Sequence, residues 1–110
     1  MSTVVAASSL TPTLGVETTV DAVIQTSGTF QLWVECTALV TTEMLFLRTY
    51  RETKDSNTKL LCRTMIFRGD ETEELKETLP IAVPDNVSLT FTLQQKIGAA
   101  RTYHYSIEKL

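Results

Sequence analysis

Residues 26–50, TSGTFQLWVECTALVTTEMLFLRTY, contain two alternating runs that are separated by a short polar break. In the first run one side of an extended chain carries Phe30, Leu32, Val34 and Cys36, and the other side carries Gln31, Trp33, Glu35 and Thr37. This period of two predicts a strand with one buried face. The second run, residues 43–50, is apolar on both sides near Leu45 and Phe46, which is typical of a core strand that is covered on both faces.

The same pattern recurs along the rest of the chain. Residues 16–25 alternate and lead into the turn sequence at 26–28, which predicts a hairpin with the first run. Residues 59–68 form another apolar run and predict a long hairpin with residues 44–54, across a turn at 55–57. Residues 71–77 are good helix formers, so a helical turn competes with a strand there.

The last third of the chain predicts three more strands. Leu79, Ile81 and Val83 alternate around Pro80, which suits an edge strand or a strand start because proline lacks a ladder donor. Residues 84–86 read as a turn. In the next segment Val87, Leu89, Phe91 and Leu93 face inward, and Ser88, Thr90, Thr92 and Gln94 face out. The final strand places Tyr103, Tyr105 and Ile107 on one side.

About seven or eight strands at roughly ten-residue spacing predict an all-β domain over residues 15–110. Antiparallel sheets with one apolar face must cover it with a second sheet where helices are absent, so we expect a two-sheet β-sandwich. The strand number suits a jelly-roll-like arrangement, and an immunoglobulin-like connectivity stays open.

Residues 1–14 differ from this domain in being small and mostly polar. The few apolar side chains, among them Val4, Val5 and Leu10, are too sparse to offset the entropy of ordering the segment. We therefore expect a flexible, extended N-terminal arm that orders only against a partner or the domain edge, with a merely frayed terminus as the alternative. The segment lacks the pattern of a signal peptide, and no run is long enough for a membrane span.

Charge and cysteine content narrow the classes of function. The net charge is −3, and Lys and Arg are spread along the chain, which disfavours binding to nucleic acid. Cys36 and Cys62 each lie in a predicted strand beside apolar neighbours. Two buried thiols are therefore favoured over a disulfide.

We find no pattern of residues for catalysis, a cofactor or a metal. His104 is the only histidine and has no second ligand at a metal-binding spacing. The serines and cysteines form no nucleophile motif, and the glycines are isolated, as in turns rather than phosphate loops. The acidic cluster of Asp70, Glu71, Glu73, Glu74 and Glu77 reads as a solvated face rather than a cation site.

Trp33 is the strongest candidate for an interaction surface, because it lies on the polar side of its strand and tryptophan is enriched at interfaces. Phe46 and Tyr50 share one face of the next strand and are expected to extend the patch. With the apolar residues of the arm, the predicted partner-binding residues are Val4, Val5, Leu10, Trp33, Phe46 and Tyr50.

Two segments resemble small proteins encoded among the head genes of tailed bacteriophages. The first has the form T-x-G-T-[FY]-x-L-W-V-[DE], here Thr26, Gly28, Thr29, Phe30, Leu32, Trp33, Val34 and Glu35. The second has the form F-T-L-x-Q-x-x-G-x-x-R-x-[FYW], here Phe91, Thr92, Leu93, Gln95, Gly98, Arg101 and Tyr103. The resemblance covers the chain from about Leu14 to its C-terminus.

This resemblance implies a virion structural protein, not an enzyme, and for a chain of this size a head decoration (cement) protein. Such a protein is expected to assemble in the host bacterial cytoplasm and to bind the major capsid protein on the outside of the head, as a homo-oligomer such as a dimer or trimer. A head-completion or tail protein is one alternative. Another is a carbohydrate-binding module that stacks sugars on Trp33 or on Tyr103 and Tyr105.

Overall fold

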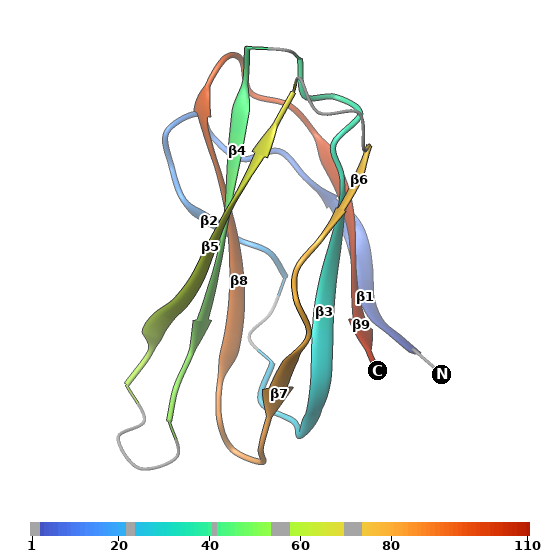
Figure 1. Ribbon diagram of the computed structural model, residues 1–110, viewed down its shortest axis with the longest axis vertical. Coiled ribbons are helices and arrows are strands. Elements are labelled where there is room, and N and C mark those ends of the chain that lie inside the picture. The colour runs from blue at the N-terminus through green and yellow to red at the C-terminus, as the bar shows by residue number, and fades with distance from the viewer. Residues whose placement is uncertain (1–2, 22–23, 41, 54–57, 70–73) are drawn as a thin grey trace.

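All the regular structure is β-strand in the computed structural model, which describes residues 3–21, 24–40, 42–53, 58–69 and 74–110. These residues form nine strands and no helix (Figure 1). The strands are β1 Thr3–Leu10, β2 Thr18–Thr19, β3 Gly28–Glu35, β4 Met44–Arg51, β5 Leu60–Arg68, β6 Leu75–Glu77, β7 Ile81–Val83, β8 Leu89–Ile97 and β9 Tyr103–Lys109.

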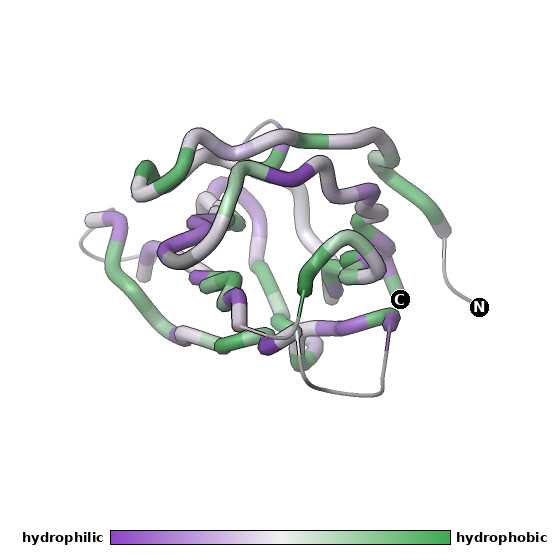
Figure 2. Tube along the Cα trace, turned by 90° about the horizontal axis from the view of Figure 1, so that it is seen from above, coloured by the Kyte–Doolittle hydropathy of each residue, from purple (hydrophilic) through white to green (hydrophobic). Residues whose placement is uncertain are grey.

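The strands make two antiparallel sheets. Sheet A has five strands in the order β1-β9-β3-β6, with β7 also pairing with β3, and sheet B has the order β2-β8-β4-β5. The two sheets face each other (Figure 1), and Figure 2 views these layers end-on, with hydrophobic and hydrophilic residues alternating along the trace. The prediction of an all-β domain with two antiparallel sheets is confirmed, with slightly more strands than expected.

The core lies between the sheets and is built by the predicted inward faces of three strands. All eleven side chains predicted to face inward from β3, β8 and β9 and the residues beside them are buried: Phe30, Leu32, Val34, Cys36, Val87, Leu89, Phe91, Leu93, Tyr103, Tyr105 and Ile107. Each of these strands has a neighbour on both sides in its sheet. Their alternation therefore reports a real division between core and exterior.

The predicted hairpin between residues 16–25 and β3 is wrong. Only Thr18 and Thr19 form a strand there, and β2 pairs with β8 in sheet B, whereas β3 belongs to sheet A. Asp21 has φ of 59°, which interrupts the extended chain, and Ile24 beyond it still bridges Leu89 of β8 in sheet B. Ala22 and Val23, which complete the predicted alternation, lie outside the described residues.

The hairpin of β4 and β5 is confirmed, and its predicted turn at 55–57 lies outside the described residues. For two residues of these strands the predicted burial is wrong. Phe46 is only half-buried, because the outer face of β4 is covered by the cationic side chains of Arg48 and Lys96 rather than by another layer. Cys62 is exposed because β5 is the edge strand of sheet B, whereas Cys36 is buried as predicted, and neither forms a disulfide.

Several positions elsewhere also differ from the predicted alternation. Gln31, Thr90 and Thr92 were predicted to face outward but are buried. The Glu17 carboxylate covers Thr92, whose hydroxyl donates to it at 2.5 Å. Leu79 is 60% exposed, because the preceding Thr78 turns inward and accepts the Leu32 N–H at 3.0 Å. Pro80 directly precedes β7, as predicted for a strand start.

Two segments for which the sequence left alternatives open are strands in the structure. Residues 75–77 are strand rather than helical turn, and they pair with β3, while residues 70–73 lie outside the described part of the chain. Residues 3–10, predicted to order only against a partner or the domain edge, form the edge strand β1, which pairs with β9. The division into a flexible arm and a domain stays a prediction.

One end of the sandwich is held by a buried carboxylate that the sequence did not single out. Glu43 is 2% exposed and lies just before β4. It accepts the backbone N–H of Val40 at 2.9 Å and of Ala99 at 3.0 Å, and Arg101 donates to it at 3.1 Å. The carboxylate therefore joins the start of β4 to the connection between β8 and β9.

The β8–β9 connection is shaped around this carboxylate. Gly98 has φ of 101°, and a Cβ there would lie only 2.0 Å from a Glu43 oxygen, so only glycine fits. Tyr103 is buried and donates to Gln95 Oε1 at 2.7 Å, while Gln95 Nε2 donates to the Ala99 carbonyl at 2.6 Å. Burial, with the nearby Glu43 charge, raises the pKa of the Tyr103 hydroxyl, so it stays a donor.

We predict that Glu43→Ala lowers the free energy of unfolding by about 1–3 kcal/mol, because it leaves Arg101 and two backbone N–H groups, all partly accessible to water, without their acceptor. Urea denaturation followed by circular dichroism measures this. Glu35→Ala, which removes an exposed carboxylate from β3, is the matched control and should change the value by less than about 0.5 kcal/mol. Equal effects of the two substitutions would contradict the stabilising role of Glu43.

The same carboxylate makes stability depend on pH. Burial raises the pKa of Glu43, but hydrogen bonds from Val40, Arg101 and Ala99 outweigh it and hold the pKa below its ordinary value. The unfolded chain then binds more protons at this group than the folded one, so the stability that Glu43 contributes is present above about pH 4.3 and is lost as the pH falls below it. Glu43→Gln should be less stable at neutral pH, with a shallower decline on acidification. Denaturation series from pH 7 to pH 3 check this, and parallel curves for the two proteins would refute it.

Candidate binding surfaces

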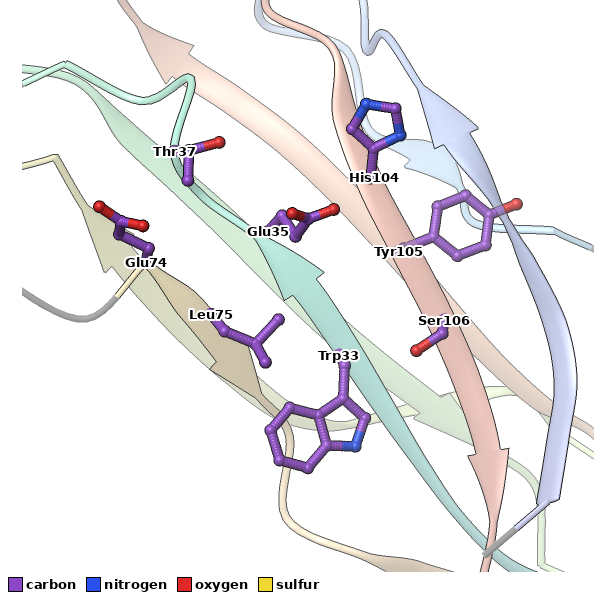
Figure 3. Close-up of a pocket in the computed structure, with 8 residues that line it drawn as sticks. All are labelled: Trp33, Glu35, Thr37, Glu74, Leu75, His104, Tyr105 and Ser106. Carbon is purple, nitrogen blue, oxygen red and sulfur yellow. The ribbon is translucent and has the colours of Figure 1, made fainter.

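A groove of about 350 Å³ crosses the outer face of sheet A. It is formed by β3, β6 and β9 and by the residues that flank them (Figure 3). The outward positions of these strands meet there because Trp33 is opposite Ser106 of β9, and Glu35 is opposite Leu75 of β6. The groove is therefore a product of strand register on a face that the sequence predicted to be outward.

Trp33 forms one end of the groove and Leu75 part of its side (Figure 3). The indole is half-buried, and its Nε1 is buried without a hydrogen-bond partner among the described residues. Leu75 is 52% exposed. These two side chains give the groove an apolar part that is open to solvent.

The remainder of the groove is polar and carries two exposed carboxylates, Glu35 and Glu74, together with the exposed imidazole of His104. An indole face beside carboxylates can hold a cationic group by cation–π and ionic contacts, or a sugar by stacking and hydrogen bonds to hydroxyls. Figure 3 shows Glu35 and His104 on adjacent strands, with the Tyr105 ring directed away from Trp33.

Tyr103 and Tyr105 are not a stacking platform for sugars, contrary to one of the sequence-based alternatives. Both rings belong to the core. The Tyr105 hydroxyl donates to Asp21 at 3.0 Å, and burial together with this bond raises its pKa. Of the three aromatic residues considered for sugar stacking, Trp33 is therefore the one that faces solvent.

The outer face of sheet B carries aromatic rings under cations. Arg48 and Lys96 lie 5.5 and 5.0 Å from the centre of the Phe46 ring, and Lys59 Nζ lies 4.8 Å from that of Tyr50. The Tyr50 hydroxyl donates to Glu17 at 2.5 Å. Phe46 and Tyr50 are therefore already engaged by their own chain.

Glu17 anchors this face. Burial raises its pKa, but hydrogen bonds from Thr92 and Tyr50 and the charges of Arg48 and Lys59 outweigh burial, so the pKa lies below its ordinary value. Arg48 approaches the carboxylate to 3.6 Å. The segment that precedes β2 is thus tied to the outer face of β4 and β8.

The predicted continuous patch of Trp33, Phe46 and Tyr50 is wrong. Trp33 projects from β3 on the outer face of sheet A, whereas Phe46 and Tyr50 project from β4 on the outer face of sheet B. Because the two sheets face each other across the core, these residues lie on opposite sides of the sandwich (Figure 1).

The two sheets also have edge strands with exposed apolar side chains. On β1, Val4 is 58% and Val5 46% exposed, whereas Leu10 packs against the core and does not belong to an open surface. On β5, at the other sheet's edge, Leu60, Leu61 and Ile66 are exposed. Sequence reasoning missed the β5 residues because an apolar run reads as buried unless the strand is known to be an edge.

The acidic groove should favour cations over anions. Trp33 is the only tryptophan, so its fluorescence reports on the groove. We predict that the quenching by caesium, divided by its quenching of free N-acetyltryptophanamide, exceeds the same quotient for iodide at low salt, because Glu35 and Glu74 attract cations. The double variant Glu35→Gln/Glu74→Gln should reduce the difference between the two quotients, as should 0.5 M salt, which screens charges. A larger quotient for iodide in the unmodified protein would contradict this description.

Comparisons with known proteins provide no relative for this chain: no family model, no curated protein and no solved structure matches it. In the part of the chain that the structure describes, no helix is long and apolar enough to cross a membrane. The choice of function therefore rests on the surfaces described above and on the sequence motifs.

Proposed function

We propose that the protein is a virion structural protein that decorates the head of a tailed bacteriophage. It assembles in the bacterial cytoplasm, binds the outer surface of the major capsid protein shell and stabilises that shell without catalysis. The observation that carries the proposal is the open, uncharged edge of β1. The resemblance of residues 26–35 and 91–103 to phage head proteins agrees with it.

The free side of β1 suits the addition of a strand from another protein. β1 ends the order of sheet A, so no strand among the described residues pairs with the backbone N–H and C=O groups of its outer edge. Natural edge strands are usually protected by charges or proline, but the eight residues TVVAASSL contain neither. A register shift between Val4 and Ala6 gives this edge some protection. The exposed Val4 and Val5 would contribute apolar contacts to an added strand.

A second open edge, on β5, allows one copy to contact two neighbours. β1 and β5 end different sheets and lie on different sides of the sandwich (Figure 1). Weak contacts at two edges reinforce each other when the binding sites repeat on a shell, because the second contact forms at a high effective concentration. A dimer or trimer of the chain at a symmetry axis would multiply this effect.

We also propose that the connectivity is a jelly roll. Antiparallel strand pairs enclose one another along the chain. The innermost pair is β4–β5, followed by β3–β6 and β3–β7, then β2–β8, and the outermost pair is β1–β9. A long antiparallel hairpin rolled into two sheets produces this nesting, and jelly rolls occur in viral capsid proteins and lectins.

Charging the β1 edge tests the proposed function. Val4→Lys/Val5→Lys should reduce retention on capsids about tenfold or more in co-sedimentation, since lysines on an edge strand oppose strand addition. Leu14→Lys is the matched control, because Leu14 is 44% exposed but lies outside β1, and it should bind like the unmodified protein. Undiminished retention of the double variant would rule out this edge as the docking surface.

The number of copies separates a decoration protein from a head-completion or tail protein. Quantitative mass spectrometry of purified particles should find the chain in a number comparable to that of capsomers. A count near that of a single portal or tail ring would contradict head decoration and support the other virion roles.

Carbohydrate binding is the second candidate function, and the Trp33 groove favours it, because an aromatic ring beside carboxylates and hydroxyls is suited to sugars. Titration of Trp33 fluorescence with host polysaccharides, compared with Trp33→Ala on a glycan array, distinguishes this function from protein docking. Saturable binding that Trp33→Ala abolishes would support it.

A further inference from the structure

A second pocket, of about 290 Å³, lies between the two sheets at the side where β5 and β7 are found. Sheet B contributes Arg51, Cys62 and Arg63, and the opposite wall consists of Pro80, Ile81 and Ala82. The pocket is separate from the Trp33 groove, with which it shares no residue. It combines two guanidinium groups with a partly apolar wall.

The two guanidinium groups have no compensating charge in the part of the chain that the structure describes. Among the described residues, Arg48 pairs with Glu17 and Arg101 with Glu43, but no carboxylate pairs with Arg51 or Arg63. The Nε of Arg51 is buried and has no hydrogen-bond partner within residues 3–21, 24–40, 42–53, 58–69 and 74–110. Arg63 donates to the Leu79 carbonyl over 3.5 Å, which is a weak contact.

An anion would correct this imbalance. A buried N–H without an acceptor destabilises the folded state, and a half-buried charge without a partner adds to that cost. The planar fork of a guanidinium matches the paired oxygens of a carboxylate or a phosphate. The wall of Pro80, Ile81 and Ala82 gives an adjoining hydrocarbon group an apolar surface.

We propose that this pocket is an oxyanion site, which binds a carboxylate on a short apolar stem between Arg51 and Arg63. The acidic side chain of a partner protein and a free small carboxylate share this chemistry. The inference is independent of the proposed virion function, because it rests on a different surface.

Cys62 provides a reporter in the pocket itself. It is exposed, whereas Cys36 is buried, so a thiol reagent modifies Cys62 first. The rates of modification by a dianionic disulfide, 5,5′-dithiobis(2-nitrobenzoate), and by a neutral one, 4,4′-dithiodipyridine, are compared at low ionic strength. The ratio of the rate with the anionic reagent to the rate with the neutral reagent is independent of the intrinsic reactivity of the thiol. Cys62→Ser gives the background rate.

We expect Arg51→Gln/Arg63→Gln to lower this ratio about tenfold, because the positive pocket attracts the anionic reagent. Lys96→Gln removes a cation from the outer face of sheet B and should leave the ratio unchanged. Circular dichroism checks folding, and Arg63→Gln alone, which loses only the weak Leu79 contact, serves if the double variant unfolds.

Competition then identifies the ligand. Millimolar glutarate, or N-acetylglutamate amide as a mimic of a protein side chain, should slow the anionic reagent and leave the neutral reagent unaffected. Slowing by inorganic phosphate as well would support the site and extend it to phosphate groups. A ratio that neither the arginine substitutions nor any of these anions changes would overturn the proposal.

Discussion

The buried Glu43 carboxylate is the interaction on which the closed end of this sandwich depends. It lies immediately before β4 of sheet B, and it binds Arg101, which leads into β9 of sheet A. A charge removed from water must be compensated by hydrogen bonds and an opposite charge, and Glu43 has both. The backbone carbonyl of Glu43 also accepts the Gly69 N–H at 3.1 Å, which brings the end of β5 into the same group of contacts.

This interaction explains the second of the two sequence motifs, which runs from Phe91 to Tyr103. Gly98 gives the Glu43 carboxylate room, Arg101 neutralises it, and Gln95 and Tyr103 hold the connection from the core side. The spacing of these residues is thus set by the geometry of one β8–β9 turn around a carboxylate. The motif specifies how the fold is closed, whereas the proposed docking rests on β1, which lies outside both motifs.

The sequence predicted the fold where alternation corresponds to a strand with neighbours on both sides. β3, β8 and β9 meet that condition, and their apolar faces are buried. Alternation shows that a strand has two faces but not which strand lies beside it. Cys62 on β5 was therefore assigned to the core, and Trp33, Phe46 and Tyr50 were assigned to one surface although they belong to different sheets. The nonlocal pairing of β2 with β8 was hidden for the same reason.

The three surfaces differ in charge, so each favours a different kind of binding partner. The Trp33 groove carries Glu35 and Glu74, the pocket beside β7 carries Arg51 and Arg63, and the β1 edge carries no charge. A cation would favour the groove, an anion the pocket, and an extended backbone an uncharged edge strand such as β1. Because all three are built on paired strands around a single core, little conformational entropy is lost when any of them binds. A protein that grips a repeating surface needs this combination, since each contact must be selective while the body that carries it stays rigid.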